Sequence, residues 1–555
     1  MRLVPVDQIG WIEADGAYVK LHMRDGSVHH QRGVLQSLEA TRDARCFVRI
    51  HRSAIVNIDL VTEVRQDSDG DHVVVLRDRT EVRRPPIPRP ARGTTGAGTM
   101  MRSNWWITGA CGAVLATLVS AAFVARAILQ GPPSRMTPAE ALHEYTGVYR
   151  SSGAGDVYVQ LWDEFTGSNR LIALRQSGEV RVLHAAARDQ FVTGPGAALE
   201  RPIESRLSFA RDGTGRIAFL TWRREGTPSW RADRVDVERH ENVGFTSGDV
   251  RLAGTLIAPR GDGPHPAIVL VHGSGAQDRH AILPFARFLV SQGVALLGFD
   301  KRGVGESDGD WSAASFEDLA RDVVAAADYL KGRADIDSAR IGLLGVSQAG
   351  WIMPIAAARS RTIAFVISVS GAGVAPSETA LDHARNEMRA AKMRGEVVAQ
   401  ITALMELQYE FARSGDGWDE YAAAREALAT ALRAAPPETF PGTPEHPYWD
   451  VIRRLYLYDP RPMLRQLSVP VLAIFGELDN NILPEKNKAA WEAELAAQGH
   501  RDYTLQILPR ANHIMLEANT GTNAEMASLR RFVPEYSAIV QEWLVSRFGR
   551  RRPEP

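Results

Sequence analysis

The sequence predicts a chain of several domains: an N-terminal β-rich domain, one membrane-length helix, a small β-domain, and a C-terminal domain built on a mainly parallel sheet. Three observations favour this fold class. The chain has 555 residues, far more than a single hydrophobic core usually organises. From about residue 243, short apolar strands alternate with amphipathic stretches of helical length. Finally, the run from Trp105 to Ala125 carries no charged residue.

Composition alone selects no partner. The chain has 65 Lys and Arg against 66 Asp and Glu, so its overall charge indicates neither a nucleic-acid partner nor a disordered tail. Its two cysteines, Cys46 and Cys111, lie in segments of quite different character. This separation argues against a disulfide and against a cysteine metal site.

The N-terminal residues 1–82 alternate apolar and polar side chains, with turn signals at Asp25-Gly26 and Asp69-Gly70. This pattern predicts a small β-rich domain. Residues 83–104 are rich in Pro, Gly, Thr and Arg, a composition that extends rather than packs. We therefore expect a linker there.

The uncharged run predicts a transmembrane helix over residues 105–127, because about 20 apolar residues at about 1.5 Å each span a bilayer core. Basic residues before it favour a cytoplasmic N-terminus, with the C-terminal domains outside the cytoplasm and the lipid bilayer as a partner. A cleaved secretory signal over 101–127, starting at Met100 or Met101, is the alternative, and it predicts a secreted or periplasmic protein. A buried core helix is a third reading.

Residues 137–240 contain short strand-like runs broken by Gly, Ser and Asp, for example Val157 to Leu161 and Ile217 to Trp222. No catalytic cluster stands out in them. We expect a supporting β-domain, with a share in substrate binding as the alternative.

Residues 243–548 are typical of a parallel sheet covered on both faces. Between the fourth and fifth of the predicted strands, residues 377–467 are rich in Ala, Glu and Arg with helical spacing, which predicts a helical cap. The predicted strands are Ala267 to Val271, Val294 to Phe299, Ile341 to Leu344, Ile363 to Val369, Val471 to Phe475 and Tyr503 to Leu508.

A candidate nucleophile lies where the third of these strands meets a helix, in the run Gly345 to Gly350 (GVSQAG). A serine on such a turn takes a strained backbone conformation, so the residues two before and two after it must be small. Gly345 and Ala349 meet that need around Ser347. The Gly-x-Ser-x-Ala spacing alone is common, and its strand-to-helix setting is what makes it informative.

A serine hydroxyl needs an imidazole to take its proton and a carboxylate to orient that imidazole. Asp479 follows the fifth predicted strand, and His513 follows the sixth, in the chain order serine, acid, histidine. Each residue alone has an ordinary explanation, as a turn aspartate or a surface histidine. Their joint placement predicts a catalytic triad of Ser347, Asp479 and His513.

Such a triad also needs donors for the oxyanion of the tetrahedral intermediate. The first predicted strand runs into His272 to Gly275 (HGSG), a glycine-rich turn. We expect the backbone N–H groups of Ser274 and Gln348 to be these donors. A phosphate-binding loop is the other reading of this turn, but the Gly-Lys-Ser/Thr ending and the G-x-G-x-x-G spacing are both missing.

The HGSG turn, the run Asp300 to Ser307 (DKRGVGES), the serine turn and the two downstream residues together resemble the α/β-hydrolase superfamily. Within it, residues 243–548 are most similar to bacterial carboxylesterases described as dienelactone-hydrolase-like or serine-aminopeptidase-like. The resemblance implies hydrolysis of a small carboxylic ester through an acyl-serine intermediate, without metal or organic cofactor. It also implies that Asp300 and Arg302 brace the loop beneath the site. A peptidase or an acyltransferase using the same triad remains open.

Residues 9–76 resemble the LytTR DNA-binding domain of bacterial response regulators, through Trp11 to Val19 (WIEADGAYV) and Phe47 to Asn57 (FVRIHRSAIVN). The resemblance implies DNA contact by Tyr18, His51 and Arg52. A solvated loop face is the alternative for these residues, and for Tyr18 half-burial in a strand. A membrane-tethered transcription regulator with a hydrolase-like sensor domain is the competing function for the whole chain.

Overall fold

The computed structural model divides the chain into two compact units, Met1–Asn104 and Trp105–Pro555, which are described separately. The described residues are 9–15, 18–23, 28–32, 47–51, 54–57, 60–66, 72–76, 81–83, 142–162, 170–432, 436–437 and 439–549.

The N-terminal unit consists of two antiparallel sheets. The first has five strands in the order β3-β2-β1-β5-β4, and the second has the order β6-β7-β8. Ile12 lies opposite both Leu21 and Ile55 in the register, and all three are buried on one face of the first sheet. The strands are β1 (Ile9–Asp15), β2 (Tyr18–Met23), β3 (Val28–Arg32), β4 (Phe47–His51), β5 (Ala54–Asn57), β6 (Val61–Gln66), β7 (His72–Leu76) and β8 (Glu81–Arg83).

The two small sheets share one apolar core. Val56 of the first sheet clusters with Val74, Leu76 and Val82 of the second. The alternation seen in the sequence therefore places one apolar face of each sheet against the other.

The predicted transmembrane helix, residues 105–127, lies outside the described residues. Among the helices that the structure does describe, none is both long and apolar enough to cross a membrane. The longest of them, α8 (Gly395–Ser414), has 20 residues but carries charges such as Glu396 and Arg413. The predictions of a transmembrane helix, a single-pass membrane localisation and a lipid-bilayer partner are corrected on this finding, and none is retained.

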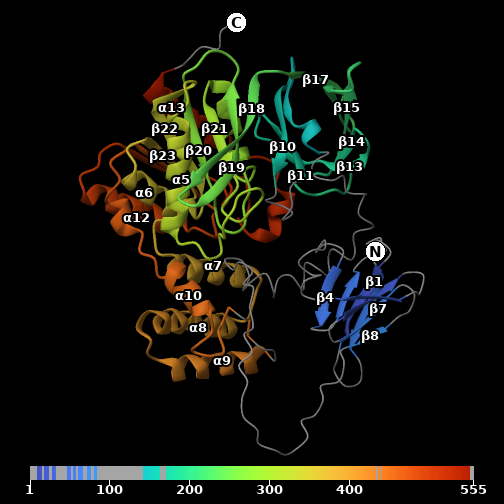
Figure 1. The fold of residues 1–555 in the computed structure, drawn as a ribbon, viewed down its shortest axis with the longest axis vertical. Coiled ribbons are helices and arrows are strands. Elements are labelled where there is room, and N and C mark those ends of the chain that lie inside the picture. Colours follow the sequence, from blue (N-terminus) through green and yellow to red (C-terminus); the bar gives the residue numbers. More distant parts are fainter. Residues whose placement is uncertain are drawn as a thin grey trace, which may run out of the picture. The chain divides into compact units, whose positions relative to one another are not determined.

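A β-domain opens the described part of the C-terminal unit (Figure 1). It is a nine-stranded antiparallel sheet in the order β12-β11-β10-β9-β17-β16-β15-β14-β13. Side chains such as Tyr149, Val159 and Leu220 form its own core. The strands are β9 (Gly147–Ser151), β10 (Gly155–Trp162), β11 (Arg170–Arg175), β12 (Val180–Val182), β13 (His184–Ala187), β14 (Gln190–Thr193), β15 (Ser205–Arg211), β16 (Ile217–Arg224) and β17 (Trp230–Val235).

The β-domain packs directly on the domain that follows it. Successive side chains of β10 point to opposite faces, so Tyr158 and Trp162 leave the β-domain core and join the apolar cluster that includes Phe285. The indole N–H of Trp162 donates to the carbonyl of Ala281 at 3.0 Å. The β-domain is thus a fixed neighbour of the domain that carries the predicted triad.

An eight-stranded sheet forms the centre of that domain, in the order β18-β19-β21-β20-β22-β23-β24-β25. The strands from β21 to β25 pair in parallel, whereas β18 and β19 form an antiparallel hairpin at one edge. The strands are β18 (Glu238–Ser247), β19 (Val250–Pro259), β20 (His265–Val271), β21 (Ala295–Phe299), β22 (Ile336–Val346), β23 (Ile363–Val369), β24 (Val471–Gly476) and β25 (Tyr503–Leu508). All six predicted strands are confirmed.

Helices cover both faces of this sheet. α5 (Phe316–Lys331) and α6 (Ala349–Arg359) bury one apolar face of it. α4 (Leu283–Ala286), η4 (Arg287–Gln292) and α13 (Pro534–Phe548) bury the other. α12 (Pro484–Ala497) packs Trp491 and Leu495 against β24. The two-sided cover explains why the parallel strands are apolar throughout.

The insertion between β23 and β24 is helical, as predicted, and has its own aromatic core. Phe411, Trp418, Tyr421 and Trp449 pack with ring centroids 4.7 to 6.5 Å apart. Its elements are α7 (Pro376–Ala390), α8, α9 (Trp418–Leu432), α10 (Tyr448–Val451), the π-helical turn η5 (Ile452–Tyr456) and α11 (Arg461–Leu464).

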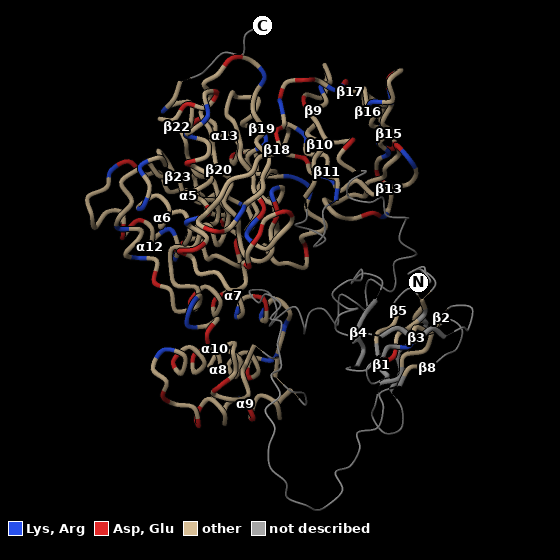
Figure 2. Tube along the Cα trace, in the orientation of Figure 1, with Lys and Arg blue, Asp and Glu red and all other residues tan. Residues whose placement is uncertain are grey.

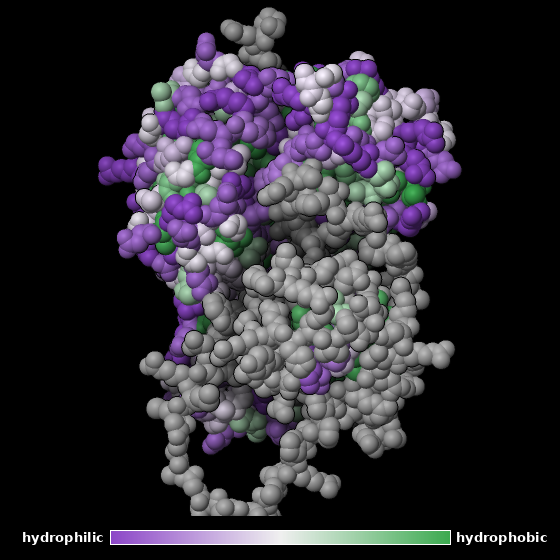
Figure 3. Space-filling view, turned by 45° about the vertical axis from the view of Figure 1, so that its right-hand side comes forward, coloured by the Kyte–Doolittle hydropathy of each residue, from purple (hydrophilic) through white to green (hydrophobic). Residues whose placement is uncertain are grey.

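Charges of both signs are interspersed over the C-terminal unit (Figure 2). The face of this unit drawn in Figure 3 is mainly hydrophilic, with hydrophobic residues in small, separate patches. The described part of this face therefore presents no broad apolar surface for a partner.

Candidate active site

Ser347 lies on the tight turn between β22 and α6, with a backbone φ of 59°. A non-glycine residue rarely adopts this left-handed conformation, and such strain is common at functional positions. Its N–H donates to the carbonyl of Val369 at 3.1 Å, which ties the turn to the neighbouring strand β23. The turn therefore holds Ser347 at the carboxyl end of a central strand.

The small residues around this turn are required by close packing. A Cβ on Gly345 would lie 2.4 Å from the Cβ of Ala349, and one on Gly350 would lie 2.4 Å from the backbone N of Ala372. Larger side chains would force the serine turn open, as the sequence spacing predicts.

Asp479 and His513 are brought together by the structure. His513 Nδ1 lies 2.9 Å from Asp479 Oδ2. The other carboxylate oxygen of Asp479 accepts the N–H groups of Asn481 and Ile482, each at 2.8 Å. Asp479 is 2% exposed, so its carboxylate is held in one orientation away from bulk water. A carboxylate placed in this way fixes the imidazole with its proton on Nδ1.

The loop that carries His513 is positioned by residues that the sequence did not single out. The side-chain oxygen of Asn512 accepts the N–H groups of Ile514 and Leu516 at 3.1 and 2.9 Å. A Cβ on Gly476 would lie 2.4 Å from the carbonyl oxygen of Asn512. Gly476 thus allows the histidine loop to approach the strand that leads to Asp479.

The HGSG turn after β20 is held from below by a buried lysine. Lys301 Nζ donates to the carbonyls of Gly273 and Gly275 at 2.6 and 2.7 Å, and Gln277 Oε1 accepts the N–H of Gly273 at 2.6 Å. Ser274 lies in the middle of this braced turn. Gln348 directly follows Ser347 at the N-cap of α6, where backbone N–H groups have no partner within the helix.

His272, at the start of this turn, is buried and neutral. Burial, followed by the positive charge of Lys301, lowers the pKa of His272 to about 3. Its Nε2–H donates to the carbonyl of Phe299 at 2.6 Å. His272 therefore links the turn to β21 as a neutral hydrogen-bond donor.

The run after β21 supports the same turn, and the sequence identified only part of it. Asp300 accepts hydrogen bonds from Arg279 and from the N–H of Glu306, and Arg302 pairs with Asp322. Burial disfavours the charged form of Asp300, but its hydrogen bonds outweigh burial and lower its pKa. Lys301, which the sequence analysis passed over, contacts the turn itself.

A second missed residue is His383, on the first cap helix α7. Burial lowers its pKa, and Glu387, the backbone of Asn480, His513 and Asp479 all act on its charge. His383 Nδ1 is buried and has no hydrogen-bond partner among the described residues. A histidine inside a helical insertion gives no sequence signal, because only the fold brings the cap beside Asp479 and His513.

The cap is fastened to the same region. Lys486 of α12 lies 2.7 Å from Asp382 and 3.0 Å from Glu378, both on α7. Asn487 Oδ1 accepts the N–H of Gly373 at 2.8 Å. These contacts place α7 over the loop that carries Asp479.

Two of the three predicted DNA contacts lie in the N-terminal sheet. Tyr18 is the first residue of β2, and His51 is the last residue of β4, whereas Arg52 lies outside the described residues. Asp15 pairs with Tyr18, Glu13 pairs with Ala54, and Ala54 pairs with His51. The start of β2 and the end of β4 therefore lie at the same end of the sheet.

Within the described part of the chain, no group of three His, Cys, Asp or Glu side chains is placed so that it could hold a metal ion.

Two families match different parts of the chain. The LytTR DNA-binding domain matches residues 1–85, and the X-Pro dipeptidyl-peptidase (S15) family matches residues 247–514.

Among characterised relatives, esterase EstD of Thermotoga maritima is 26% identical over 314 residues, which cover 55% of this chain and 68% of EstD. The quorum-quenching protein AidA of Acinetobacter baumannii is 33% identical over 128 residues, 23% of this chain and 42% of AidA. An uncharacterised 31.7 kDa protein of Escherichia coli is matched over 41% of its length, so these two relatives are covered over less than half.

Among solved structures, an esterase of Pyrococcus furiosus is 17% identical with a TM-score of 0.36, covering 56% of this chain and 91% of that one. The family and relative matches agree on one organisation. The chain carries a LytTR DNA-binding domain at its N-terminus and an esterase-like α/β-hydrolase region of the S15 kind in its C-terminal part.

Proposed function

We propose that the hydrolase region cleaves small carboxylic esters, with Ser347 as nucleophile, His513 as general base and Asp479 as the supporting acid. The observation that carries this proposal is the 2.9 Å contact between His513 Nδ1 and Asp479 Oδ2, in the same domain as a serine on a strained strand-to-helix turn. The similarity to EstD favours an ester as the substrate.

In this mechanism Asp479 accepts the Nδ1–H of His513, so Nε2 is the nitrogen that accepts a proton. Ser347 Oγ attacks the ester carbonyl while its proton passes to His513 Nε2. The carbonyl oxygen becomes an oxyanion, which accepts hydrogen bonds from the N–H groups of Ser274 and Gln348.

The intermediate collapses when the C–O bond to the alcohol breaks and His513 returns its proton to the departing oxygen. Water then attacks the acyl-serine with His513 as base, and the acid leaves with Ser347 restored. No step of this cycle needs a redox partner, because every proton moves between Ser347, His513, water and the leaving group.

A panel of short-chain p-nitrophenyl esters and dipeptidyl p-nitroanilides tests the reaction. We expect the full chain to hydrolyse the esters, and Ser347→Ala to abolish that activity while circular dichroism stays unchanged. Ser338→Ala, an exposed serine earlier in β22, is the matched control and should retain full activity. Retained activity in Ser347→Ala would contradict the assignment of the nucleophile.

The same panel distinguishes ester hydrolysis from the peptidase alternative, which the match to the X-Pro dipeptidyl-peptidase (S15) family supports. Faster cleavage of anilides than of esters would replace the esterase proposal by a peptidase. Transfer of the acyl group to an added alcohol in preference to water would replace it by an acyltransferase.

We propose further that the N-terminal unit binds duplex DNA through the end of the sheet that holds Tyr18 and His51, together with Arg52, the next residue in the sequence. The LytTR match and the common position of Tyr18 and His51 at one end of the sheet support this proposal.

A mobility-shift titration of the full chain against duplex DNA at several salt concentrations is the test. We expect affinity to fall steeply with salt, because phosphate contacts release counterions. His51→Ala should weaken binding, whereas His29→Ala, on β3 toward the other end of the sheet, should not. The absence of any complex at low salt would end the proposal.

A further inference from the structure

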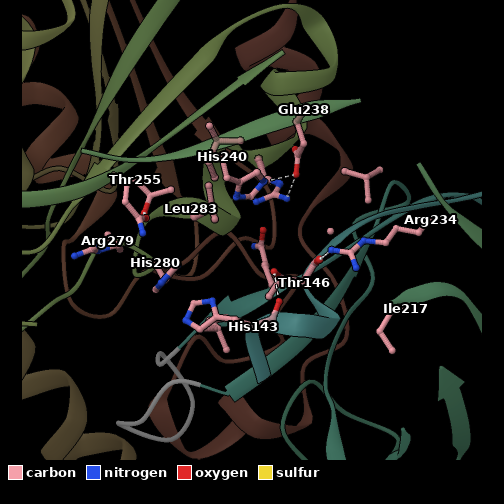
Figure 4. Close-up of a pocket in the computed structure, with 18 of the residues that line it drawn as sticks. His143, Thr146, Ile217, Arg234, Glu238, His240, Thr255, Arg279, His280 and Leu283 are labelled. Atoms are coloured by element: carbon pink, nitrogen blue, oxygen red, sulfur yellow. Dashed lines mark hydrogen bonds and ion pairs between the residues drawn. The ribbon is translucent and has the colours of Figure 1, made fainter. Parts of the chain in front are cut away.

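A large cleft lies between the β-domain and the hydrolase sheet, and its lining does not include the predicted triad. Its volume is about 1030 Å³, in the size range of small-molecule sites. Figure 4 shows its two walls: Glu238, His240 and Thr255 come from β18 and β19, and Thr146 and Arg234 come from the β-domain.

The side chain of Gln160 is the feature of this cleft that points to a ligand. On β10 it occupies the same face as Tyr158 and Trp162, both of which are buried. Gln160 is 1% exposed and lines the cleft, yet neither Nε2 nor Oε1 of its amide has a hydrogen-bond partner among the described residues. A buried amide without partners is unfavourable, so a polar residue in this aromatic row indicates a function.

The facing wall offers the same kind of open groups. Glu238 and Arg287 form a buried ion pair, and Glu238 Oε1 also lies 2.8 Å from His240 Nε2. Glu238 Oε2 and Arg287 Nε are buried and, within the described part of the chain, have no hydrogen-bond partner. Together with the amide of Gln160, the cleft thus has two donor atoms and two acceptor atoms without a hydrogen-bond partner among the described residues.

Several charged side chains that line the cleft already have partners within the protein. Arg279 pairs with Asp300 and Glu306, and the guanidinium of Arg234 donates to backbone carbonyls, including that of Thr146 at 2.6 Å. A strongly charged ligand would have to break these pairs. The balance of unused donors and acceptors instead suits a neutral ligand whose groups both donate and accept.

We propose that this cleft is a second binding site of the protein, for a neutral saccharide held by Gln160, Glu238 and Arg287. Each sugar hydroxyl both donates and accepts, so a row of them can satisfy the amide and the carboxylate together. The rings of His143 and His280, 5.6 Å apart and tilted by 54°, add flat faces against which the C–H faces of a sugar ring pack.

The site is separate from the predicted catalysis, so its test uses binding and not turnover. The full chain is applied to an array of neutral oligosaccharides, and hits are titrated by calorimetry with the free sugar. Glucuronic acid and tetra-alanine serve as the charged and peptide probes. Ser347→Ala is included because it keeps the cleft intact and removes hydrolysis of any acetylated sugar.

We expect a neutral saccharide to bind the wild type and Ser347→Ala equally, and Gln160→Leu to weaken binding at least tenfold while ester hydrolysis is unchanged. His143→Ala, an exposed position at the rim, gives a second variant that leaves the fold undisturbed and should weaken binding less. Absence of binding to every neutral sugar, or equal binding by both cleft variants and wild type, would overturn the site. Tighter binding of glucuronic acid or tetra-alanine would overturn the ligand class.

Discussion

The predicted active site and the interdomain cleft differ in how their buried polar groups are satisfied. Asp479 has three contacts to its two oxygens, and Lys301 donates to two carbonyls of the HGSG turn. In the cleft, the amide of Gln160 has no partner among the described residues. A catalytic site must hold its groups in place before the substrate arrives, whereas a binding site can leave groups open for its ligand.

The largest effect should come from breaking the pair at the active site. Asp479→Asn keeps the size of the side chain, but the N–H groups of Asn481 and Ile482 would hold its amide oxygen. The amide NH2 would then face His513 and could not accept from Nδ1–H. We expect kcat on a p-nitrophenyl ester to fall by about 10⁴-fold with the fold unchanged. Glu485→Gln, an exposed carboxylate in the first turn of α12, should have wild-type activity. If Asp479→Asn lowered kcat no more than this control does, Asp479 would not be the acid.

Loosening the HGSG turn should have a smaller effect. Lys301→Met keeps most of the length of the side chain but removes both hydrogen bonds to the turn that carries Ser274. Because the oxyanion forms only during reaction, we expect kcat to fall by about 10²-fold with KM little changed. Lys331→Met, on an exposed face of α5, is the matched control. A change in KM alone would show that Lys301 acts on substrate binding instead.

The sequence predicted the strands and the serine turn because local patterns encode them. Apolar runs mark the parallel strands, and the small residues Gly345 and Ala349 mark the turn around Ser347. The hairpin of β18 and β19 was missed, since β18 alternates buried and exposed residues and has no apolar run. The apolar run at 105–127 gave the opposite kind of error, a predicted element that was then corrected. Composition alone led to a membrane helix that the described structure does not support.

The residues that sequence analysis missed depend on contacts between distant segments. Lys301 reaches carbonyls 26 and 28 residues away, and only the fold of the cap brings His383 near enough to His513 and Asp479 for their charges to act on it. Gln160 is a polar residue among apolar neighbours on β10, but its burial without a hydrogen-bond partner among the described residues depends on what the hydrolase domain places opposite it. Periodicity cannot show such pairings.

The pH dependence of stability should reflect both regions. Burial lowers the pKa of His272 to about 3 and that of His280 to about 4, against an ordinary value of 6.5. Below pH 6.5 the unfolded chain binds protons that the folded chain does not, so the free energy of unfolding should fall as the pH drops from 6.5 toward 4. Urea unfolding at a series of pH values measures the slope.

Replacing either histidine measures its contribution to the slope of the free energy of unfolding against pH. His272→Asn, behind the HGSG turn, and His280→Asn, in the cleft, should each reduce this slope by about one proton. A slope unchanged in both variants would mean that neither imidazole is kept neutral by the fold.

The smallest effect tests the contrast between satisfied and open polar groups directly. Gln160→Leu removes a buried amide that lacks partners among the described residues, so we expect the free energy of unfolding to rise by about 1 kcal/mol. Asn487→Leu removes a buried amide that accepts from Gly373 and donates to Leu483, and should lower it by about 1–3 kcal/mol. Urea unfolding of both variants without added sugar gives the two values. Gln160→Leu and Asn487→Leu could instead lower the free energy of unfolding equally. The amide of Gln160 would then already have partners in the folded protein. The cleft would be a structural contact between the two domains and not a site left open for a ligand.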